Sequence, residues 1–154
     1  GVIDAYGRID VLINNAGITA VGALETVSEQ ALKEVFETNV FGAVRMIQAV
    51  LPSMRTRRQG VIVNVTSMMG RITLPGHGSY AATKFALSAF SEALAMEMRP
   101  FNVRVVIIEP GVILTPIWHK RRVPLPEGGR WREVHILMYA TAVAFAAYFI
   151  WGAE

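Results

Sequence analysis

The feature that most constrains the fold is the alternation of short apolar runs with long amphipathic stretches. Apolar runs occur at residues 10–15, 61–65 and 103–108, and the last two are rich in β-branched side chains. Such runs are typical of buried strands, and the β-branched run at 61–65 suits a sheet covered on both faces. Two stretches with helical spacing separate them. The order strand, helix, strand, helix, strand therefore predicts an α/β fold with parallel strands.

Both predicted helices have recognisable ends. The first begins at Thr26-Val-Ser-Glu29, a capping-box pattern, and keeps apolar residues at helical spacing as far as Pro52. The second runs from about residue 79 to residue 99 and stops at Pro100, because the residue before a proline disfavours helix. Residues 1–7 resemble the last turns of a helix that closes on a glycine.

Composition excludes several classes of protein. The 154 residues are 53% hydrophobic and 18% charged, which suits one globular domain and not a disordered chain. The 15 basic and 12 acidic residues are spread over several segments, so nucleic acid is not an expected partner. The absence of cysteine excludes disulfides and favours a reducing, cytoplasmic location. The three histidines lie too far apart in sequence to suggest a metal site.

Tyr80 and Lys84 are the first candidates for chemistry. They stand four residues apart on the second predicted helix, so their side chains leave the same face one turn apart. A nearby ammonium group lowers the pKa of a tyrosine from about 10, which lets it exchange a proton with an alcohol or a carbonyl near neutral pH. Two such residues also often meet on a solvated helix face, so the pair alone is a weak signal.

Ser67 and Asn39 extend this candidate site. Ser67 follows the run at 61–65, and the loop from it to Tyr80 contains three glycines and a proline, so the serine hydroxyl can fold over the start of the helix. The plain alternative is a strand-end serine that bonds to its own backbone. Asn39 is a poor helix former within a predicted helix, a conflict that is often functional. Its alternative is an outward-pointing, solvated side chain.

The motifs Asn14-Asn15-Ala16-Gly17, Asn39-Val40, Ser67, Tyr80-Ala-Ala-Thr-Lys84 and Pro110-Gly111 together resemble, in type and spacing, those of the short-chain dehydrogenase/reductase family. The resemblance covers residues 1–117, the catalytic C-terminal half of the family. It implies a partial Rossmann-type parallel sheet, with strands four to six of the family fold and flanking helices. It also implies an oxidoreductase that transfers hydride between NAD or NADP and an alcohol or carbonyl.

The resemblance assigns roles residue by residue. Tyr80 would be the acid/base, and Lys84 would lower its pKa and hold the nicotinamide ribose. Ser67 would hydrogen-bond the substrate oxygen, and Asn39 would hold a water that links Lys84 to solvent. The cofactor-binding residues would be Asn14, Ala16, Gly17, Tyr80, Lys84, Pro110, Gly111 and Thr115.

The sequence departs from the family pattern at its beginning. It contains no Gly-x-x-x-Gly-x-Gly turn, which in the family grips the pyrophosphate. By comparison with the family, the chain begins at the end of the helix before the fourth strand, so the choice between NAD and NADP stays open. The strand at 10–15 would then be an uncovered edge. We therefore expect the isolated chain to self-associate and to be inactive with either nucleotide.

The sequence also departs from the family after Trp118. Residues 118–133 form a basic connector rich in proline and glycine, and residues 134–154 form an apolar tail. Residues 134–153 carry no formal charge when His135 is neutral, and this stretch is long enough for a membrane-spanning helix. The basic residues that precede it would place the enzyme portion on the cytoplasmic side. A buried final helix or strand is the alternative. Contact with a membrane through 134–153 is therefore a prediction.

The leading functional hypothesis is an oxidoreductase acting on a hydrophobic alcohol or ketone. The segment 39–48 and the apolar loop residues resemble family members that use steroids, retinoids or other lipids. A 3-oxoacyl-carrier-protein reductase is the alternative within the enzyme class. A truncated, non-catalytic remnant that cannot bind cofactor is the alternative outside it. A homo-oligomer is expected.

Overall fold

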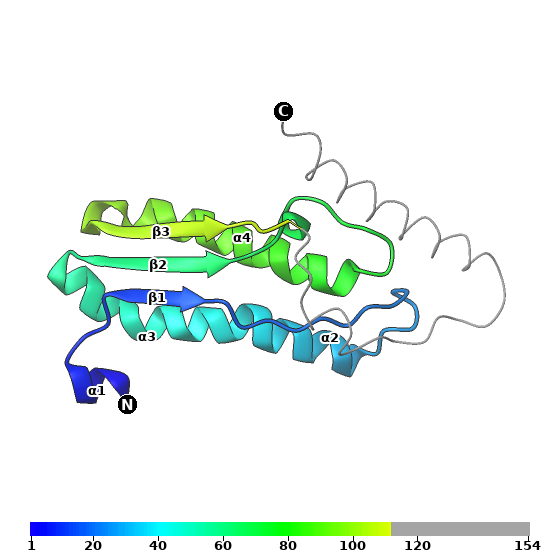
Figure 1. Ribbon diagram of the computed structural model, residues 1–154, viewed down its shortest axis with the longest axis horizontal. Coiled ribbons are helices and arrows are strands. Elements are labelled where there is room, and N and C mark those ends of the chain that lie inside the picture. The colour runs from blue at the N-terminus through cyan, green and yellow to red at the C-terminus, as the bar shows by residue number, and fades with distance from the viewer. Residues whose placement is uncertain (112–154) are drawn as a thin grey trace.

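The computed structural model describes residues 1–111, which form a three-stranded parallel sheet with helices packed against it. The strands are β1 (Val11–Asn14), β2 (Gly60–Val65) and β3 (Val103–Ile108), in the spatial order β1-β2-β3. Figure 1 shows all three arrows pointing the same way. The predicted α/β fold with parallel strands is confirmed, and the carboxyl ends of the strands share one edge of the sheet.

The helices account for most of the rest of the described chain. The α-helices are α1 (Val2–Tyr6), α2 (Glu29–Phe36), α3 (Gly42–Arg57) and α4 (Gly78–Met98). A π-helical turn, η1 (Glu37–Phe41), joins α2 to α3, and two short 3-10 helices are η2 (Met68–Gly70) and η3 (Arg99–Phe101). Helix α1 closes on Gly7 with a left-handed φ of 76°, as its sequence predicts. Helix α4 lies within one residue of its predicted bounds.

Two predicted helix boundaries are wrong. The N-cap of α2 is Ser28, whose hydroxyl accepts from the Ala31 backbone N–H at 3.2 Å, while the Thr26 hydroxyl turns back to the Ala23 carbonyl. Pro52 does not end α3, which continues to residue 57. The last turn survives the missing proline N–H because its apolar face continues into Met54, which is fully buried.

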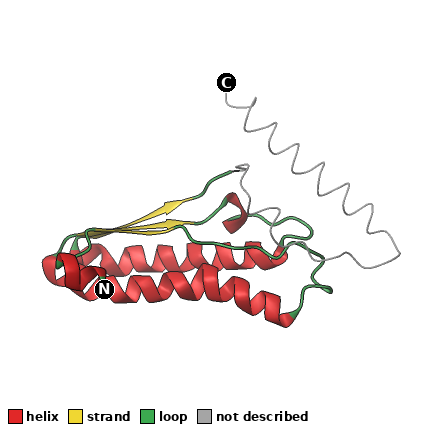
Figure 2. Ribbon diagram, turned by 60° about the horizontal axis from the view of Figure 1, so that its bottom comes forward, coloured by secondary structure: helices red, strands yellow, loops and turns green. Residues whose placement is uncertain are grey.

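Helices α3 and α4 lie side by side on one face of the sheet (Figure 2). The main core lies between them and the strands, and its buried members are Leu12, Ile47, Val50, Met54, Ile62, Leu94, Met98 and Val103. On the opposite face, Val11, Ile13, Val106 and Ile108 are exposed within the described part of the chain. The prediction that both faces of the sheet are covered is therefore not met by residues 1–111.

Candidate active site

Asn39 lies in the π-helical turn η1 and is only 1% exposed. Its Oδ1 accepts from the Ile18 backbone N–H at 2.8 Å. Its Nδ2 donates to the Ile18 carbonyl at 2.9 Å and to the Thr83 hydroxyl at 3.0 Å. The alternative of a solvated, outward-pointing side chain is therefore wrong. One amide instead joins the loop after β1 to α4, at the kind of helical bulge that is frequent at functional sites.

Ser67 and Tyr80 come together at the carboxyl end of β2. Ser67 stands in extended backbone two residues after the strand, and its hydroxyl accepts from the Met69 backbone N–H at 3.1 Å, which caps η2. The same hydroxyl is hydrogen-bonded to the Tyr80 phenol, and both side chains are buried. The structure thus brings these two hydroxyls together. The backbone bond expected of a strand-end serine is present as well, and it fixes the direction of the side chain.

Gly70 lets the loop that carries Ser67 lie directly against α4. A Cβ at this position would stand 2.7 Å from the Ser88 Oγ and 3.1 Å from the Lys84 carbonyl oxygen. The Ser88 hydroxyl is buried and has no hydrogen-bond partner among the described residues. A side chain at this position would force one of these groups to move, so Gly70 allows the Ser67 loop to pack closely on α4.

Lys84 lies one turn along α4 from Tyr80 and is 4% exposed. Its Nζ donates to the Val65 carbonyl at 2.8 Å and stands 5.5 Å from the centre of the Tyr80 ring. Burial lowers the pKa of Lys84 to about 8, because the charged form loses solvation.

Burial has the opposite effect on the phenol, since here the charged form is the deprotonated one. It raises the pKa of Tyr80, and the hydrogen bond with Ser67 opposes this rise. Desolvation is thus the larger effect on the Tyr80 phenol, and the lowering of its pKa by Lys84 stays a prediction of the resemblance.

The segments after β1 and β3 border the same group of side chains. A Cβ at Gly17 would stand 3.5 Å from the Asn39 Oδ1 and 3.7 Å from the Lys84 Nζ, which are ordinary van der Waals distances, so this glycine lies directly beside both groups. The Pro110 carbonyl accepts from the Met68 backbone N–H at 2.9 Å, which places the end of β3 beside the Ser67 loop. Ala16 and Gly111 are exposed near these segments.

Asn14, expected in the cofactor cleft, has its side chain turned along the sheet. Its Nδ2 donates to the Asn64 Oδ1 at 2.8 Å, and the Asn64 Nδ2 donates to the Ser91 hydroxyl at 2.7 Å. Sequence reasoning missed this buried polar chain and also missed Thr83. The signal available in the sequence was Asn64, a single asparagine in the otherwise apolar run of β2.

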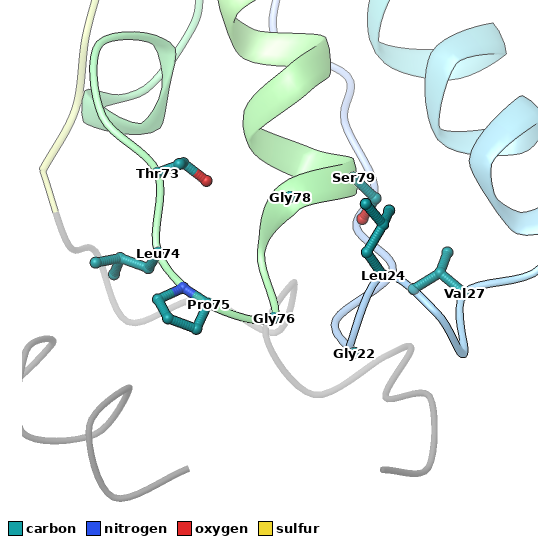
Figure 3. Close-up of a pocket in the computed structure, with 9 residues that line it drawn as sticks. All are labelled: Gly22, Leu24, Val27, Thr73, Leu74, Pro75, Gly76, Gly78 and Ser79. Atoms are coloured by element: carbon teal, nitrogen blue, oxygen red, sulfur yellow. The ribbon is translucent and has the colours of Figure 1, made fainter. Parts of the chain in front are cut away.

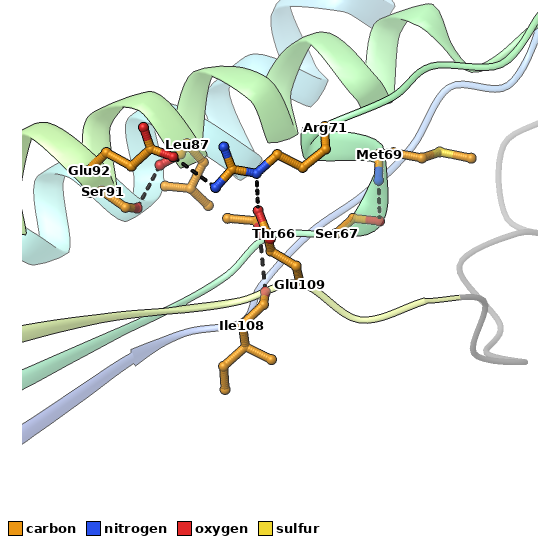
Figure 4. A network of polar contacts seen from close by, with 9 residues as sticks. All are labelled: Thr66, Ser67, Met69, Arg71, Leu87, Ser91, Glu92, Ile108 and Glu109. Atoms are coloured by element: carbon orange, nitrogen blue, oxygen red, sulfur yellow. Dashed lines mark hydrogen bonds and ion pairs between the residues drawn. The ribbon is translucent and has the colours of Figure 1, made fainter. Parts of the chain in front are cut away.

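Arg71 joins three elements around the Ser67 loop (Figure 4). Its guanidinium group lies 2.7 Å from a carboxylate oxygen of Glu109, after β3, and 2.8 Å from one of Glu92, on α4. These two carboxylates raise the pKa of Arg71. Thr66, just before Ser67, adds two bonds from its N–H and hydroxyl to the Ile108 carbonyl, at 2.8 and 3.2 Å. The loop is thus tied to both β3 and α4.

Several expectations fall on residues that the structure does not describe. Thr115, the connector 118–133 and the apolar tail 134–154 lie outside residues 1–111. Within residues 1–111, no helix is long and apolar enough to cross a membrane. In the same part of the chain, no group of three or more His, Cys, Asp or Glu side chains could hold a metal ion.

Comparison with known proteins gives one family. The family model for short chain dehydrogenases matches residues 1–125. Retinol dehydrogenase 8 from Bos taurus is 50% identical over 109 residues, which cover 71% of this chain and 35% of that protein. A 3-ketodihydrosphingosine reductase from Bacteroides thetaiotaomicron is 44% identical over 122 residues, which cover 79% of this chain and 45% of that protein. The chain therefore spans less than half the length of these two relatives.

Solved structures support the same family. A short-chain dehydrogenase from Streptomyces avermitilis matches with a TM-score of 0.79 and 39% identity, over 99% of this chain and 60% of that one. ElxO with NADP bound matches with a TM-score of 0.73 and 29% identity, over 77% and 48% of the two chains. NAD+-bound xylitol dehydrogenase matches with a TM-score of 0.71 and 30% identity, over 92% and 50%. The resemblance expected from the motifs, including the partial Rossmann-type sheet, is confirmed.

Proposed function

Because the chain belongs to the short-chain dehydrogenase/reductase family, we propose that it carries the catalytic residues of an NAD(P)-dependent oxidoreductase that interconverts an alcohol and a carbonyl on a hydrophobic substrate. The observation that carries this proposal is the buried Tyr80 phenol, hydrogen-bonded to Ser67 and followed one helical turn later by Lys84. A proton donor, a second hydroxyl and a cation around one point are the groups that this chemistry requires. Asn39 completes the proposed set.

The residues on the page fit the nicotinamide end of a dinucleotide. Gly17 leaves space beside the Lys84 Nζ that a Cβ would fill, and an ammonium group is a suitable donor to ribose hydroxyls. A bound nicotinamide would supply or accept the hydride. Besides Lys84, we propose that the residues holding the cofactor are Asn14, Ala16, Gly17, Tyr80, Pro110, Gly111 and Thr115. NAD and NADP remain equal choices, since the solved relatives hold one or the other.

The proton transfer is assigned to the Tyr80 hydroxyl. In the direction of reduction, this hydroxyl gives its proton to the substrate oxygen while the Ser67 hydroxyl hydrogen-bonds that same oxygen. Burial raises the Tyr80 pKa, so the phenol is protonated at neutral pH and ready to act as the acid. In the direction of oxidation, the phenolate must form first, and the nearby Lys84 cation favours it when protonated.

We assign Asn39 a narrower role than the one that the family resemblance implies. Both hydrogens of its Nδ2 already donate, one to the Ile18 carbonyl and one to the Thr83 hydroxyl. The water that the family pattern places here would therefore have to bond to an oxygen of Asn39. The amide also holds the loop after β1 against α4, which keeps Gly17 beside Lys84.

Tyr80→Phe tests the proposal in the whole protein. Phenylalanine keeps the ring but has no proton to exchange, so we expect nearly all turnover to be lost while nicotinamide binding is retained. Tyr6→Phe is the matched control, because Tyr6 is 80% exposed on α1 and far from the site in sequence. Equilibrium binding and stopped-flow measurements separate the two steps. Near-normal turnover of Tyr80→Phe would place the acid/base elsewhere.

The non-catalytic alternative gives a different binding result. A remnant that has lost its cofactor site binds neither NADH nor NADPH, whereas an enzyme must bind one of them. Fluorescence titration of the whole protein with both nucleotides distinguishes the two hypotheses. Measurable turnover by residues 1–154 would contradict the expectation that this segment alone is inactive.

A further inference from the structure

A chain of polar side chains crosses the interior from β1 through β2 to α4. The Asn14 Nδ2 donates to the Asn64 Oδ1 at 2.8 Å, and the Asn64 Nδ2 donates to the Ser91 hydroxyl at 2.7 Å. The Ser91 hydroxyl in turn donates to the Leu87 carbonyl at 2.6 Å (Figure 4). Asn64 and Ser91 are both fully buried. Because each group donates to the next, the chain has one direction and holds β2 and α4 in one relative position.

Such a chain contributes to positioning more than to stability. A buried hydrogen bond adds only about 0.5–1.5 kcal/mol net, because water satisfies both partners in the unfolded chain. A buried donor that loses its partner costs about 1–3 kcal/mol, so arrangements in which α4 slides along β2 are disfavoured. The polar chain therefore selects a single placement of α4 on the sheet.

The contact made by Lys84 depends on that placement. Lys84 stands two turns before Ser91 on the same face of α4, and its Nζ donates to the Val65 carbonyl at 2.8 Å. Val65 follows Asn64 directly in β2, so the two bonds from α4 reach consecutive residues of one strand. A shift of α4 that breaks the first bond would also change the second.

The Val65 carbonyl is open to Lys84 because β1 ends beside it. The Thr66 N–H donates to the Ile108 carbonyl of β3, so the Val65 carbonyl, one residue earlier, points toward β1. Strand β1 pairs with β2 only as far as Asn14. A buried carbonyl requires a donor, and the Lys84 ammonium group supplies one where the sheet does not.

The first turn of α4 is held by a separate set of contacts. The Ser79 hydroxyl donates to a backbone carbonyl of the loop after β1. The Gly22 N–H of that loop donates to the Gly76 carbonyl at 2.9 Å, just before α4 begins (Figure 3). Lys84 lies between Ser79 and Ser91, so α4 is fixed to the rest of the fold on both sides of the lysine.

We propose that Asn64 and Ser91 are positioning residues for Lys84. Their hydrogen bond sets α4 on β2 so that the lysine keeps its bond to the Val65 carbonyl. The proposal rests on the proposed function, because that function gives Lys84 the task of holding the nicotinamide ribose. It adds the support that holds the lysine in place, two turns further along α4.

The pKa of Lys84, measured by NMR in the whole protein with carbon-13-labelled lysine, tests the proposal. Burial lowers this pKa to about 8, and the titratable group beside the Nζ is Tyr80, whose ring centre lies 5.5 Å away. The Lys84 signal is assigned by its absence in Lys84→Met. Ser91→Ala removes the hydroxyl that accepts from Asn64, so the lysine should gain contact with solvent and its pKa should rise toward 10.5.

Two further variants separate positioning from a general loosening of the core. Asn64→Leu removes the other partner of the same hydrogen bond and should also raise the Lys84 pKa. Ser88→Ala is the matched control, since Ser88 is also buried on α4 but its hydroxyl has no hydrogen-bond partner among residues 1–111. It should keep the wild-type pKa of Lys84.

Nucleotide affinity supplies the functional measurement. If Lys84 holds the ribose, the dissociation constant for NADH or NADPH should rise by up to about tenfold in Ser91→Ala and stay unchanged in Ser88→Ala. Failure of the wild type to bind either nucleotide would contradict the proposed function and leave the titration of Lys84 intact.

The positioning role would be overturned by an unchanged Lys84 pKa in Ser91→Ala and Asn64→Leu. Failure of both variants to fold would also overturn it, because the polar chain would then serve stability alone. An equal rise of the pKa in Ser88→Ala would have the same consequence, since the effect would not depend on the bond between α4 and β2.

Discussion

Adding one methyl group at Gly70 measures how closely the Ser67 loop packs on α4. The new Cβ would stand 2.7 Å from the Ser88 Oγ, a distance at which one of the two must move, and 3.1 Å from the backbone oxygen of Lys84. Overpacking of this kind costs about 1–3 kcal/mol. The reduced freedom of the unfolded chain returns about 0.4–1 kcal/mol. We therefore expect Gly70→Ala to lower the free energy of unfolding by about 1–2 kcal/mol.

Ser88→Ala supplies the second arm of a double-mutant cycle. The Ser88 hydroxyl is buried without a partner among the described residues, so its removal should cost little stability. It also removes the closest obstacle to the new methyl group. The double variant should recover about 1 kcal/mol of what Gly70→Ala loses, which is a coupling typical of residues in contact. The remainder of the loss reflects the Lys84 carbonyl, which stays in place.

Urea unfolding followed by circular dichroism measures these differences, with equal m-values as the condition for comparing them. Gly78→Ala is the control, because a Cβ there meets no atom within 4 Å and its φ is not positive. It should leave stability unchanged or slightly higher. Wild-type stability of Gly70→Ala, together with no coupling to Ser88→Ala, would show that the loop does not press on α4 in this way.

The remaining predictions concern the polar contacts of the site. Burial lowers the Lys84 pKa from 10.5 to about 8, so the unfolded chain keeps this proton at a pH where the folded chain has lost it. Relative to Lys84→Met, the wild type should therefore gain up to about 3 kcal/mol of stability as the pH rises through this window, measured by urea unfolding. Asn39→Ala removes three hydrogen bonds and takes the side-chain partner from both the Ile18 N–H and the Ile18 carbonyl, so it should cost about 2–4 kcal/mol. Asn15→Ala, on an exposed residue, should cost little. Arg71→Met should reduce stability only slightly, because the ion pairs are exposed, and the difference from wild type should shrink at high salt.

Local pattern was sufficient to predict the three strands and helix α4, but not the division of the first predicted helix into α2, η1 and α3. Strand β3 and helix α4 are bounded by signals within a few residues of their ends, a β-branched run in one case and Pro100 in the other. The continuation of α3 past Pro52 was not predictable in this way. Whether a helix continues past a proline depends on packing beyond it, here the burial of Met54, and that burial is set by contacts with the sheet.

The sequence singled out several residues of the candidate site but not their contacts across the fold. Asn39 stood out because its helix preference conflicts with its position, yet its bond to Thr83 spans 44 residues of sequence. No local signal indicates such a pairing. The hydrogen bond between Asn14 and Asn64 also has no local signal, because it depends on the register in which β1 pairs with β2.

Burial also reverses the expected order of the Tyr80 and Lys84 pKa values. From ordinary values of 10.0 for the phenol and 10.5 for the ammonium group, it moves the Tyr80 pKa up and the Lys84 pKa down to about 8. The two groups therefore titrate in the opposite order, with Lys84 losing its proton first. Below that pH, the lysine is the cation that favours phenolate, and above it the phenol loses this support. A change of slope near pH 8 in the pH–rate profile would thus belong to Lys84, although the proposed proton exchange takes place at Tyr80.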